Sequence, residues 1–272
     1  MRVLRSAIDV AETAVVTLGS SSDAAAQARG LRERVHRPWP MPGQPWLQGQ
    51  TWRDLLFAHW PLAPERLRAV VPDALPIDTF EGQAWIAITP FEVTGLRLRG
   101  TFPVPGLSRF AETNVRTYTT VDDRPGIYFF SLDAASALAV GAARATYRLP
   151  YFHARMSIER ADGEVRYTTT RDGGGASLRV DYRPVDPPFR AAPGSLAHFL
   201  VERYCLYTVD GSRVRRAEIH HAPWTLRSAR ADVAENTMTA PTGLELPPTA
   251  PLLHYAARQD VVIWPPSPVA VA

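Results

Sequence analysis

Four polar side chains recur at every second position of one short stretch of the chain. They are Glu112, Asn114, Arg116 and Tyr118. Because side chains two residues apart share one face of a β-strand, this spacing places all four on the same face. The fork of an arginine suits carboxylates, so such a face inside a barrel would bind an anionic or carbonyl group. The same face pointing outward would be a solvated strand edge, and the spacing is compatible with both.

A second stretch shows the same alternation. Tyr151, His153 and Arg155 share one face of a predicted strand, opposite Phe152 and Ala154. Histidine titrates near neutral pH and can act as an acid or a base. The alternative interpretation is an amphipathic strand whose tyrosine and histidine lie on the surface.

Four other polar or reactive residues have plainer interpretations. His59 lies among aromatic residues and is expected to be a hydrogen-bonded core histidine. Glu202 and Arg203 adjoin each other at a predicted helix end, where we expect structural ion pairs with other residues. Cys205 sits in an apolar run and is expected to be a small buried hydrophobic side chain.

Motifs for metals and cofactors are missing from the sequence. His220 and His221 are adjacent, so in a regular strand they point to opposite faces and cannot both bind one ion. The chain contains no H-x-H, H-E-x-x-H or C-x-x-C motif. The three glycines at 173–175 are not followed by a lysine, so they do not form a phosphate loop. We therefore expect neither a metal nor a cofactor.

Composition excludes several classes of function. The chain has 272 residues with a formal net charge of +3, and all of its 30 basic residues are arginine. Without lysine, no Schiff base can form on a lysine side chain. The arginines are scattered rather than clustered, so no nucleic-acid partner is expected. A single cysteine suits the cytoplasm, and no apolar run reaches the ~18 residues of a membrane helix.

The two ends of the chain differ from the rest. Residues 1–36 are rich in alanine, serine and arginine, and we expect a loosely ordered N-terminal extension with a marginal helix at each end. Met41 stands where the dense apolar pattern begins, so translation could start there rather than at Met1. Residues 267–272 are expected to form a C-terminal tail, which leaves 37–266 as a single domain.

Between the ends, short alternating runs are separated by turn signals such as Asp162-Gly163 and Asp210-Gly211. Such pairs supply the positive φ angles of tight hairpins. We expect strands at 51–60, 84–95, 112–121, 126–133, 151–160, 164–171, 176–184, 204–209, 213–221, 226–233 and 258–264. We expect short helices at 64–71, 136–147 and 195–203. Many strands and few helices predict a mostly antiparallel barrel or sandwich.

Seven motifs carry a family resemblance. They are Arg-Pro-Trp-Pro-Met-Pro at 37–42, Leu-Leu-Phe-Ala-His-Trp-Pro at 55–61, Asn-Val-Arg-Thr-Tyr at 114–118, Tyr-Phe-Phe-Ser-Leu-Asp at 128–133, Leu-Pro-Tyr-Phe-His-Ala-Arg-Met at 149–156, Glu-Arg-Tyr-Cys-Leu-Tyr at 202–207 and Glu-Ile-His-His-Ala-Pro-Trp at 218–224. They resemble the YqjF-like family of uncharacterised bacterial proteins from about residue 37 to 266. That family is similar to the acetoacetate decarboxylase-like superfamily. The resemblance implies a mostly antiparallel β-barrel that encloses a pocket, with two or three short helices.

The order of elements extends the resemblance to the decarboxylases. Those enzymes have a strand with a functional glutamate, a hairpin, an alanine-rich helix and then a Gly-Phe-Pro-Lys-Lys turn that carries the nucleophile. The same order is expected here, and Pro150 is kept, but the two lysine positions read Tyr151 and Phe152. The Schiff-base decarboxylation of that superfamily is therefore not implied.

The resemblance implies that the strand of Arg116 and the segment after Pro150 both line the cavity. The candidate catalytic residues are Arg116 as the carboxylate or enolate site, His153 or Tyr151 as the acid-base group, and Glu112 as the group that orients them. The candidate ligand-binding residues are Arg116, Tyr118, Asn114, Phe152 and His59. The turn at Pro150 leaves open which of Tyr151, Phe152 and His153 points inward.

Three functions remain as hypotheses. The first is a lysine-independent lyase, dehydratase or isomerase acting on a small oxo-acid. The second is a binding or sensory barrel that holds a carboxylate without turnover. The third is a structural protein whose polar residues are satisfied internally. An enclosed cavity favours the first two, whereas a core filled by Trp85, Tyr118 and Phe129 favours the third. We expect a small-molecule ligand and either a monomer or a homo-oligomer.

Overall fold

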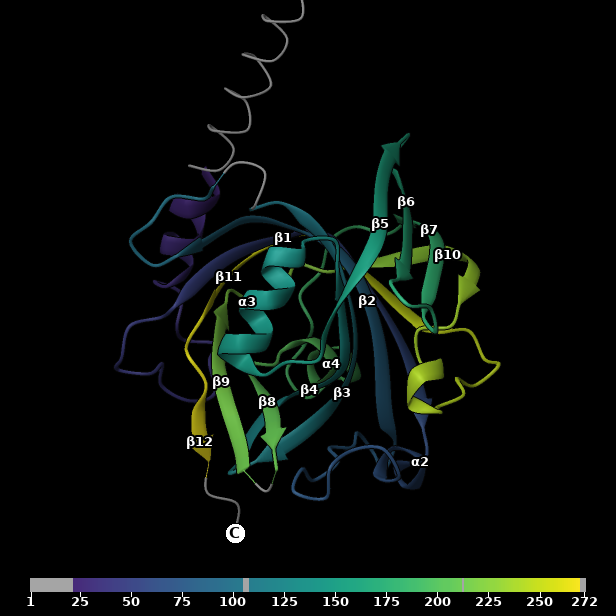
Figure 1. Ribbon diagram of the computed structural model, residues 1–272, viewed down its shortest axis with the longest axis horizontal. Coiled ribbons are helices and arrows are strands. Elements are labelled where there is room, and N and C mark those ends of the chain that lie inside the picture. The colour runs from purple at the N-terminus through teal and green to yellow at the C-terminus, as the bar shows by residue number, and fades with distance from the viewer. Residues whose placement is uncertain (1–21, 105–107, 212, 270–272) are drawn as a thin grey trace, which may run out of the picture.

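The computed structural model describes residues 22–104, 108–211 and 213–269, and within them the chain is mostly β-strand (Figure 1). The strands are β1 (Gln48–Leu62), β2 (Ala84–Leu98), β3 (Phe110–Val121), β4 (Arg124–Ala134), β5 (Tyr151–Ala161), β6 (Glu164–Arg171), β7 (Ser177–Pro184), β8 (Cys205–Asp210), β9 (Arg213–His221), β10 (Arg227–Asn236), β11 (Leu252–Ile263) and β12 (Ser267–Val269). The helices are α2 (Pro64–Arg68), α3 (Ala137–Tyr147), α4 (Leu196–Val201) and a 3-10 turn at Ala240–Thr242.

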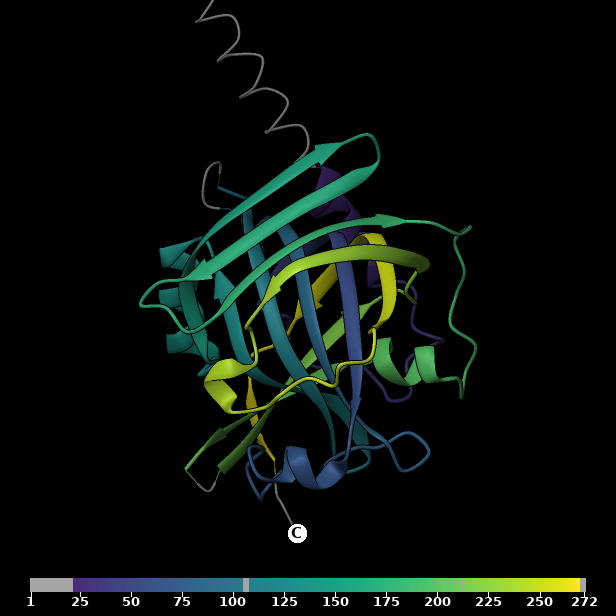
Figure 2. The same ribbon diagram turned by 90° about the vertical axis from the view of Figure 1, so that its right-hand side faces the viewer.

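The described strands form one sheet that closes on itself twice. Their order is β12-β9-β8-β4-β3-β2-β1-β11-β10-β7-β6-β5, with additional pairings of β9 with β11 and of β4 with β5. The first extra pairing closes a small ring of β1, β2, β3, β4, β8, β9 and β11. The second closes a large ring of β1 to β7, β10 and β11. Pairing is antiparallel except where β4 lies parallel to β5 and to β8. In Figure 2, strands of the large ring run obliquely across the long strands β1 and β2.

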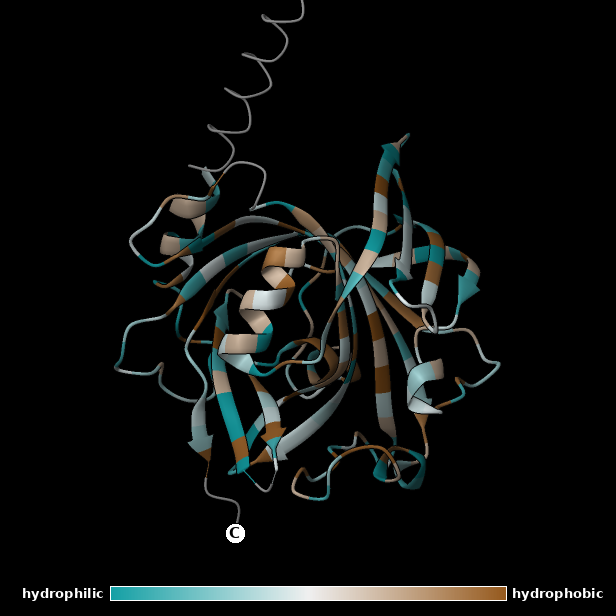
Figure 3. Ribbon diagram, viewed as in Figure 1, coloured by the Kyte–Doolittle hydropathy of each residue, from teal (hydrophilic) through white to brown (hydrophobic). Residues whose placement is uncertain are grey.

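Strands β1, β2 and β3 belong to both rings and carry apolar residues on both faces. On β1, Leu55 and Phe57 join the core of the small ring, whereas Leu56 and Ala58 join the core of the large ring. A strand covered on both faces needs a nearly continuous apolar run, which is what β2 shows (Figure 3). Strands β6 and β7 instead alternate between buried and exposed positions because only one of their faces is covered.

The prediction of a mostly antiparallel barrel with few helices is confirmed, and the predicted strands correspond one by one to β1 to β11. The three predicted helices correspond to α2, α3 and α4. Ser136 and Ser195 cap two of them by accepting hydrogen bonds from the backbone N–H groups of Ala139 and His198. No helix of the described residues is long and apolar enough to cross a membrane.

The N-terminal segment is held more firmly than predicted where it is described. Residues 22–30 form a helix that packs on β1 and β2. Its Asp23 is buried and accepts hydrogen bonds from the hydroxyl of Thr94 at 2.9 Å and from Arg53 at 2.8 Å. The helix agrees with the one predicted at this end of the extension, but it is not loose, because ion pairs of Asp23 with Arg53 and Arg258 hold it on the sheet. Residues 1–21 lie outside the described residues, and a domain boundary at residue 37 stays a prediction.

The C-terminal end also continues the fold. Ser267 to Val269 form β12, which pairs with β9 through the partners Ser267 and Arg216. The predicted tail is therefore wrong for these three residues, because an exposed edge of β9 was free to take another strand. Residues 270–272 lie outside the described residues. The predicted last strand is also longer than expected, since β11 begins at Leu252 rather than at residue 258.

Candidate functional site

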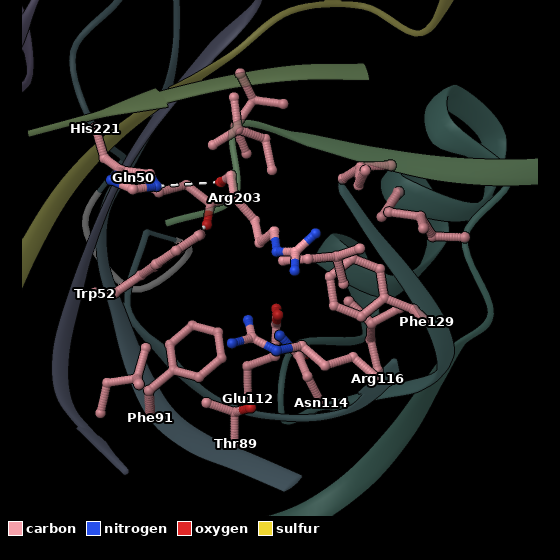
Figure 4. Close-up of a pocket in the computed structure, with 18 of the residues that line it drawn as sticks. Gln50, Trp52, Thr89, Phe91, Glu112, Asn114, Arg116, Phe129, Arg203 and His221 are labelled. Atoms are coloured by element: carbon pink, nitrogen blue, oxygen red, sulfur yellow. Dashed lines mark hydrogen bonds between the residues drawn. The ribbon is translucent and has the colours of Figure 1, made fainter. Parts of the chain in front are cut away.

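A cavity of about 60 Å³ lies inside the small ring, where α3 and the end of α4 complete its wall (Figure 4). Its apolar lining includes Trp52, Phe91, Phe129 and Trp224. Its polar lining consists of Gln48, Gln50, Thr89, Glu112, Asn114, Arg116, Tyr147, Tyr151, Arg203 and His221. A volume of this size has room for a few water molecules or for one small organic molecule. The core of the small ring is therefore hollow rather than filled.

The polar face of β3 points into this cavity. Glu112, Asn114 and Arg116 all line it, in keeping with the alternation of the strand. The pairing of β3 with β4 shifts register between Val115 and Arg116, so that Arg116 lies opposite Phe129, whose ring also lines the cavity. Such bulges commonly re-aim a side chain beside a functional site.

Two predicted ligand-binding residues lie behind the cavity wall instead. Tyr118 is fully buried and is not among the residues that line the cavity. Its hydroxyl oxygen lies 2.8 Å from Nε2 of His59, which is fully buried as well. The geometry of this cavity therefore does not support their predicted contact with a ligand, and His59 has the core position that its plainer interpretation gave it. The reason is that both residues sit farther along their strands than the cavity extends.

Of the three residues after Pro150, only Tyr151 lines the cavity. The ring of Phe152 packs against the guanidinium of Arg171 at 4.0 Å, in a separate surface cleft. The side chain of His153 is 40 % exposed, and its Nδ1 lies 2.7 Å from a carboxylate oxygen of Asp172. The predicted cavity positions of Phe152 and His153 are therefore wrong.

Phe152 and His153 lie outside the cavity because of the path of β5, and the side chains of this strand still alternate between its faces. This strand pairs with β4 only from Tyr151 to His153 and then continues into the large ring beside β6. The face that points into the cavity at Tyr151 therefore points to solvent two residues later.

Arg116 brings an uncompensated charge into the cavity. The residue is only 5 % exposed and forms no ion pair with any described residue. Its Nε has no hydrogen-bond partner, and its guanidinium carbon lies 5.2 Å from the ring centroid of Phe57. Burial lowers its pKa, but an arginine side chain remains charged in proteins. A buried cation without a counter-charge favours the entry of an anion.

Arg203 faces the same cavity (Figure 4). From the sequence we expected only a structural ion pair for this residue. That ion pair exists, since its guanidinium lies 2.6 Å from a carboxylate oxygen of Asp78. The guanidinium also stacks over the rings of Phe199 at 4.2 Å and Tyr118 at 4.9 Å. Its charge is thus compensated, unlike that of Arg116. One feature of the sequence could have indicated its position at the cavity: Arg203 is a charged residue within a mostly apolar run between a predicted helix and a predicted strand.

Glu112 holds a proton near neutral pH. The side chain is buried, and the hydroxyl of Tyr151 donates a hydrogen bond to it at 3.0 Å. Burial raises the pKa of this carboxyl to about 8, although hydrogen bonds from Tyr151 and Asn114 oppose the shift. Burial and the neighbouring Glu112 also raise the pKa of Tyr151 well above its ordinary value. The Glu112–Tyr151 pair is therefore mostly uncharged and carries exchangeable protons.

The adjacent histidines of β9 point to opposite faces, as alternation requires. His221 lines the cavity, and its Nε2 lies 3.2 Å from the carbonyl oxygen of Arg203. His220 points outward, where its Nε2 lies 3.1 Å from the carbonyl oxygen of Gly30. Among the described residues, no group of three or more His, Cys, Asp or Glu side chains has the arrangement of a metal site.

The fold and its cavity define an acetoacetate decarboxylase-like β-barrel. An acetoacetate decarboxylase from Legionella pneumophila matches with a TM-score of 0.55 and 12% identity, over 89% of this chain and 94% of that one. The enduracididine biosynthesis enzyme MppR complexed with pyruvate matches with a TM-score of 0.58 and 11% identity, over 86% of this chain and 94% of that one. At such low identity the likeness shows the fold alone.

The chain belongs to the DUF2071 family, described as an uncharacterized conserved protein family, whose model matches residues 49–260. It is 46% identical to the uncharacterized protein YqjF of Bacillus subtilis (strain 168) over 226 residues. That match covers 83% of this chain and 93% of the relative. The resemblance drawn from the seven motifs is thereby confirmed.

Proposed function

We propose that the chain binds a small oxo-acid in the cavity and transfers protons on it without a lysine, as a lyase, dehydratase or isomerase. The observation that carries this proposal is the buried guanidinium of Arg116, which lacks a carboxylate partner and shares a cavity with the Glu112–Tyr151 pair. A solved barrel of the same fold is complexed with pyruvate, which supports a small oxo-acid as the class of ligand.

Arg116 is the anion site of this proposal. Its planar fork matches the two oxygens of a carboxylate, and a carboxylate would compensate its buried charge. Arg203 adds positive potential, but Asp78 already balances its charge. The cavity therefore has one net positive charge available, which fits a ligand with one carboxylate.

Glu112 is the proton-transfer group. Its pKa of about 8 lies within roughly one unit of neutral pH, so both the acid and the base form are populated. The acid form can protonate a carbonyl oxygen, and the base form can remove a proton from the adjacent carbon. Tyr151 orients the carboxyl through its hydrogen bond. A positioned acid-base group typically accelerates such steps by about 10²–10⁴-fold.

The alternative function is a binding or sensory barrel that holds the same ligand without turnover. The predominantly apolar lining of the cavity favours it, because binding sites of this kind are mostly apolar with a few convergent polar groups. Both functions require Arg116, and only the enzyme requires Glu112 as a proton donor and acceptor.

Proton exchange in heavy water separates the two functions. Pyruvate and 2-oxobutanoate are incubated with the protein in D₂O, and deuterium incorporation beside the carbonyl is followed by NMR, with binding measured by calorimetry. We expect exchange faster than in buffer, slowed at least ~100-fold by Glu112→Gln with binding retained. Arg116→Gln should abolish binding.

Arg155→Gln is the matched control for Arg116→Gln. The side chain of Arg155 is 80% exposed and lies outside the cavity, so its loss should change neither binding nor exchange. Binding without exchange would favour the sensory barrel over the enzyme. The absence of both binding and exchange in the wild-type protein would contradict the proposal.

A further inference from the structure

Buried polar atoms without hydrogen-bond partners gather around the cavity. Five of its lining residues carry such an atom: Oγ1 of Thr89, Oδ1 of Asn114, Nε of Arg116, the hydroxyl of Tyr147 and Nε1 of Trp224. Buried polar groups in folded proteins nearly always have partners. Their concentration on one small cavity therefore indicates that its contents supply the missing partners.

Two donors of the cavity lining lie beside the ring of Phe57. The ring of Trp224 meets the ring of Phe57 edge-on, with centroids 5.0 Å apart, and the guanidinium of Arg116 lies 5.2 Å from the same Phe57 ring. An indole N–H and a guanidinium both donate and cannot accept. This pair of donors therefore suits the carboxylate of the ligand.

A second group of lining residues consists of uncharged hydroxyl and carboxyl groups. Tyr147 on α3 lies close enough to Tyr151 to raise its pKa, and Tyr151 in turn bonds Glu112. The hydroxyl of Tyr147 is buried without a partner, and burial raises its own pKa, so it stays protonated. Among the described lining residues, the arginines are Arg116 and Arg203, and neither contacts the Tyr147 hydroxyl through a described interaction. It can hydrogen-bond an uncharged oxygen but cannot neutralise an anion.

Resting on the proposed function, we propose that the cavity selects a monocarboxylate whose far end carries an uncharged oxygen, and that the Tyr147 hydroxyl binds this oxygen as the specificity-determining contact. A second carboxylate in this position would lose its hydration without gaining a cation. An apolar end would leave the Tyr147 hydroxyl unpaired, which is also unfavourable. Selectivity therefore arises at the Tyr147 hydroxyl rather than at Arg116.

A matched trio of five-carbon acids tests this selectivity. Calorimetric titration compares 4-oxopentanoate, pentanoate and glutarate, which differ in having a carbonyl, no oxygen or a second carboxylate toward the far end. The wild-type protein should bind 4-oxopentanoate about five- to tenfold more tightly than pentanoate, as expected for one hydrogen bond. Glutarate should bind more weakly than pentanoate.

The variant Tyr147→Phe removes only the hydroxyl. It should weaken the binding of 4-oxopentanoate and tighten that of pentanoate, which no longer leaves a hydroxyl unpaired, so that the two acids bind about equally. Tyr128→Phe is the control, because Tyr128 lies on β4 outside the cavity lining and its loss should preserve the preference. The three wild-type affinities test the proposal even if a variant fails to fold.

The outcomes distinguish this inference from the proposed function. If the wild-type protein binds none of the three acids, the binding site itself is contradicted. If all three bind equally, water satisfies the far end and the inference alone fails. The inference also fails if Tyr147→Phe weakens pentanoate as much as 4-oxopentanoate. A glutarate affinity above that of 4-oxopentanoate would overturn it as well.

Discussion

A buried carboxyl and a buried guanidinium on one strand face could neutralise each other, but Glu112 and Arg116 form no described ion pair. Glu112 instead accepts hydrogen bonds from Tyr151 and Asn114. Its burial stabilises the protonated form, so it provides little negative charge to Arg116 at neutral pH. The arginine charge is therefore left for a ligand. The proposed function uses this difference, with Arg116 as the anion site and Glu112 as the proton carrier.

The raised pKa of Glu112 makes the free energy of unfolding depend on pH. The carboxyl titrates at about 8 in the folded chain and near its ordinary value of 4.5 in the unfolded chain. Between these values the folded chain holds a proton that the unfolded chain has released. The stability from this group is therefore complete below pH 4.5 and is lost as the pH rises to 8, with a slope of at most ~1.4 kcal/mol per pH unit.

Glu112→Gln removes this titration. We expect the unfolding free energy of the variant, measured by urea denaturation, to improve relative to the wild-type protein as the pH rises from about 5 to about 8. A difference between the two proteins that stays constant over this range would contradict the raised pKa.

The sequence predicted part of this site and missed part of it, for physical reasons. Alternation along one strand placed Glu112, Asn114 and Arg116 together, and all three line the cavity. Alternation could not show that β5 pairs with β4 only as far as His153 and then continues beside β6. It also could not place Arg203, whose position depends on the end of α4 and on Asp78, far away in the chain. Local periodicity shows which side chains share a face of a strand. Pairing with distant strands decides whether that face points into the cavity or to solvent.

At the scale of elements, one glutamate helps to fix the N-terminal segment to the barrel. Glu218 on β9 lies 2.5 Å from Arg37, 2.7 Å from Arg124 and 3.1 Å from Arg216. Its carboxylate also accepts a hydrogen bond from the indole N–H of Trp39 at 2.8 Å. Arg37 also donates hydrogen bonds to the backbone carbonyl oxygens of Ile219 and Tyr204, so Glu218 supplies the negative charge among several contacts that hold this segment. A chain starting at Met41 would lack the contacts of both Arg37 and Trp39.

Glu218→Gln should destabilise the protein strongly. The neutral side chain would leave three arginines facing one another, with Arg37 almost fully buried. Removing one partner of a buried ion pair typically costs about 3 to 5 kcal/mol. Urea denaturation measures this loss. The control is Glu159→Gln, because that side chain is 68% exposed beside Arg166 and its loss should cost under ~1 kcal/mol. Equal effects of the two substitutions would argue against this anchoring role.

The elements themselves were largely predictable because their signals are local. Alternating runs and aspartate-glycine turns located β1 to β11 to within a few residues at most ends, and serine caps located α3 and α4. The closures between β9 and β11 and between β4 and β5 were not predictable in this way. They join segments far apart in the chain, so no local pattern encodes them. The resemblance to a known family implied a barrel, and the structure shows that its strands close into two rings.

At the scale of the whole molecule, the two rings share β1, β2, β3, β4 and β11. The small ring encloses the cavity, and the large ring covers the opposite face of the shared strands. The shared strands therefore have packed side chains on both faces. The polar face of β3 can line a cavity because the opposite face of the strand packs in the core of the large ring. This arrangement explains how a barrel with a hollow core remains well ordered around Arg116.

Four buried histidines oppose the effect of Glu112 at low pH. They are His59, His220, His221 and His254. Burial lowers the pKa of each below the ordinary value of 6.5, and that of His220 to about 4. As the pH falls below 6.5, the unfolded chain therefore takes up protons that the folded chain does not, and stability decreases.

The Glu112→Gln background isolates this contribution of the histidines. Its unfolding free energy should rise with pH between about 4 and 6.5, by up to ~1.4 kcal/mol per pH unit for each histidine. Adding His220→Gln should reduce the slope, because one of the four proton uptakes is removed. Urea denaturation at several pH values measures both slopes. Equal slopes with and without His220 would show that its ring takes up protons as readily in the folded barrel as in the unfolded chain.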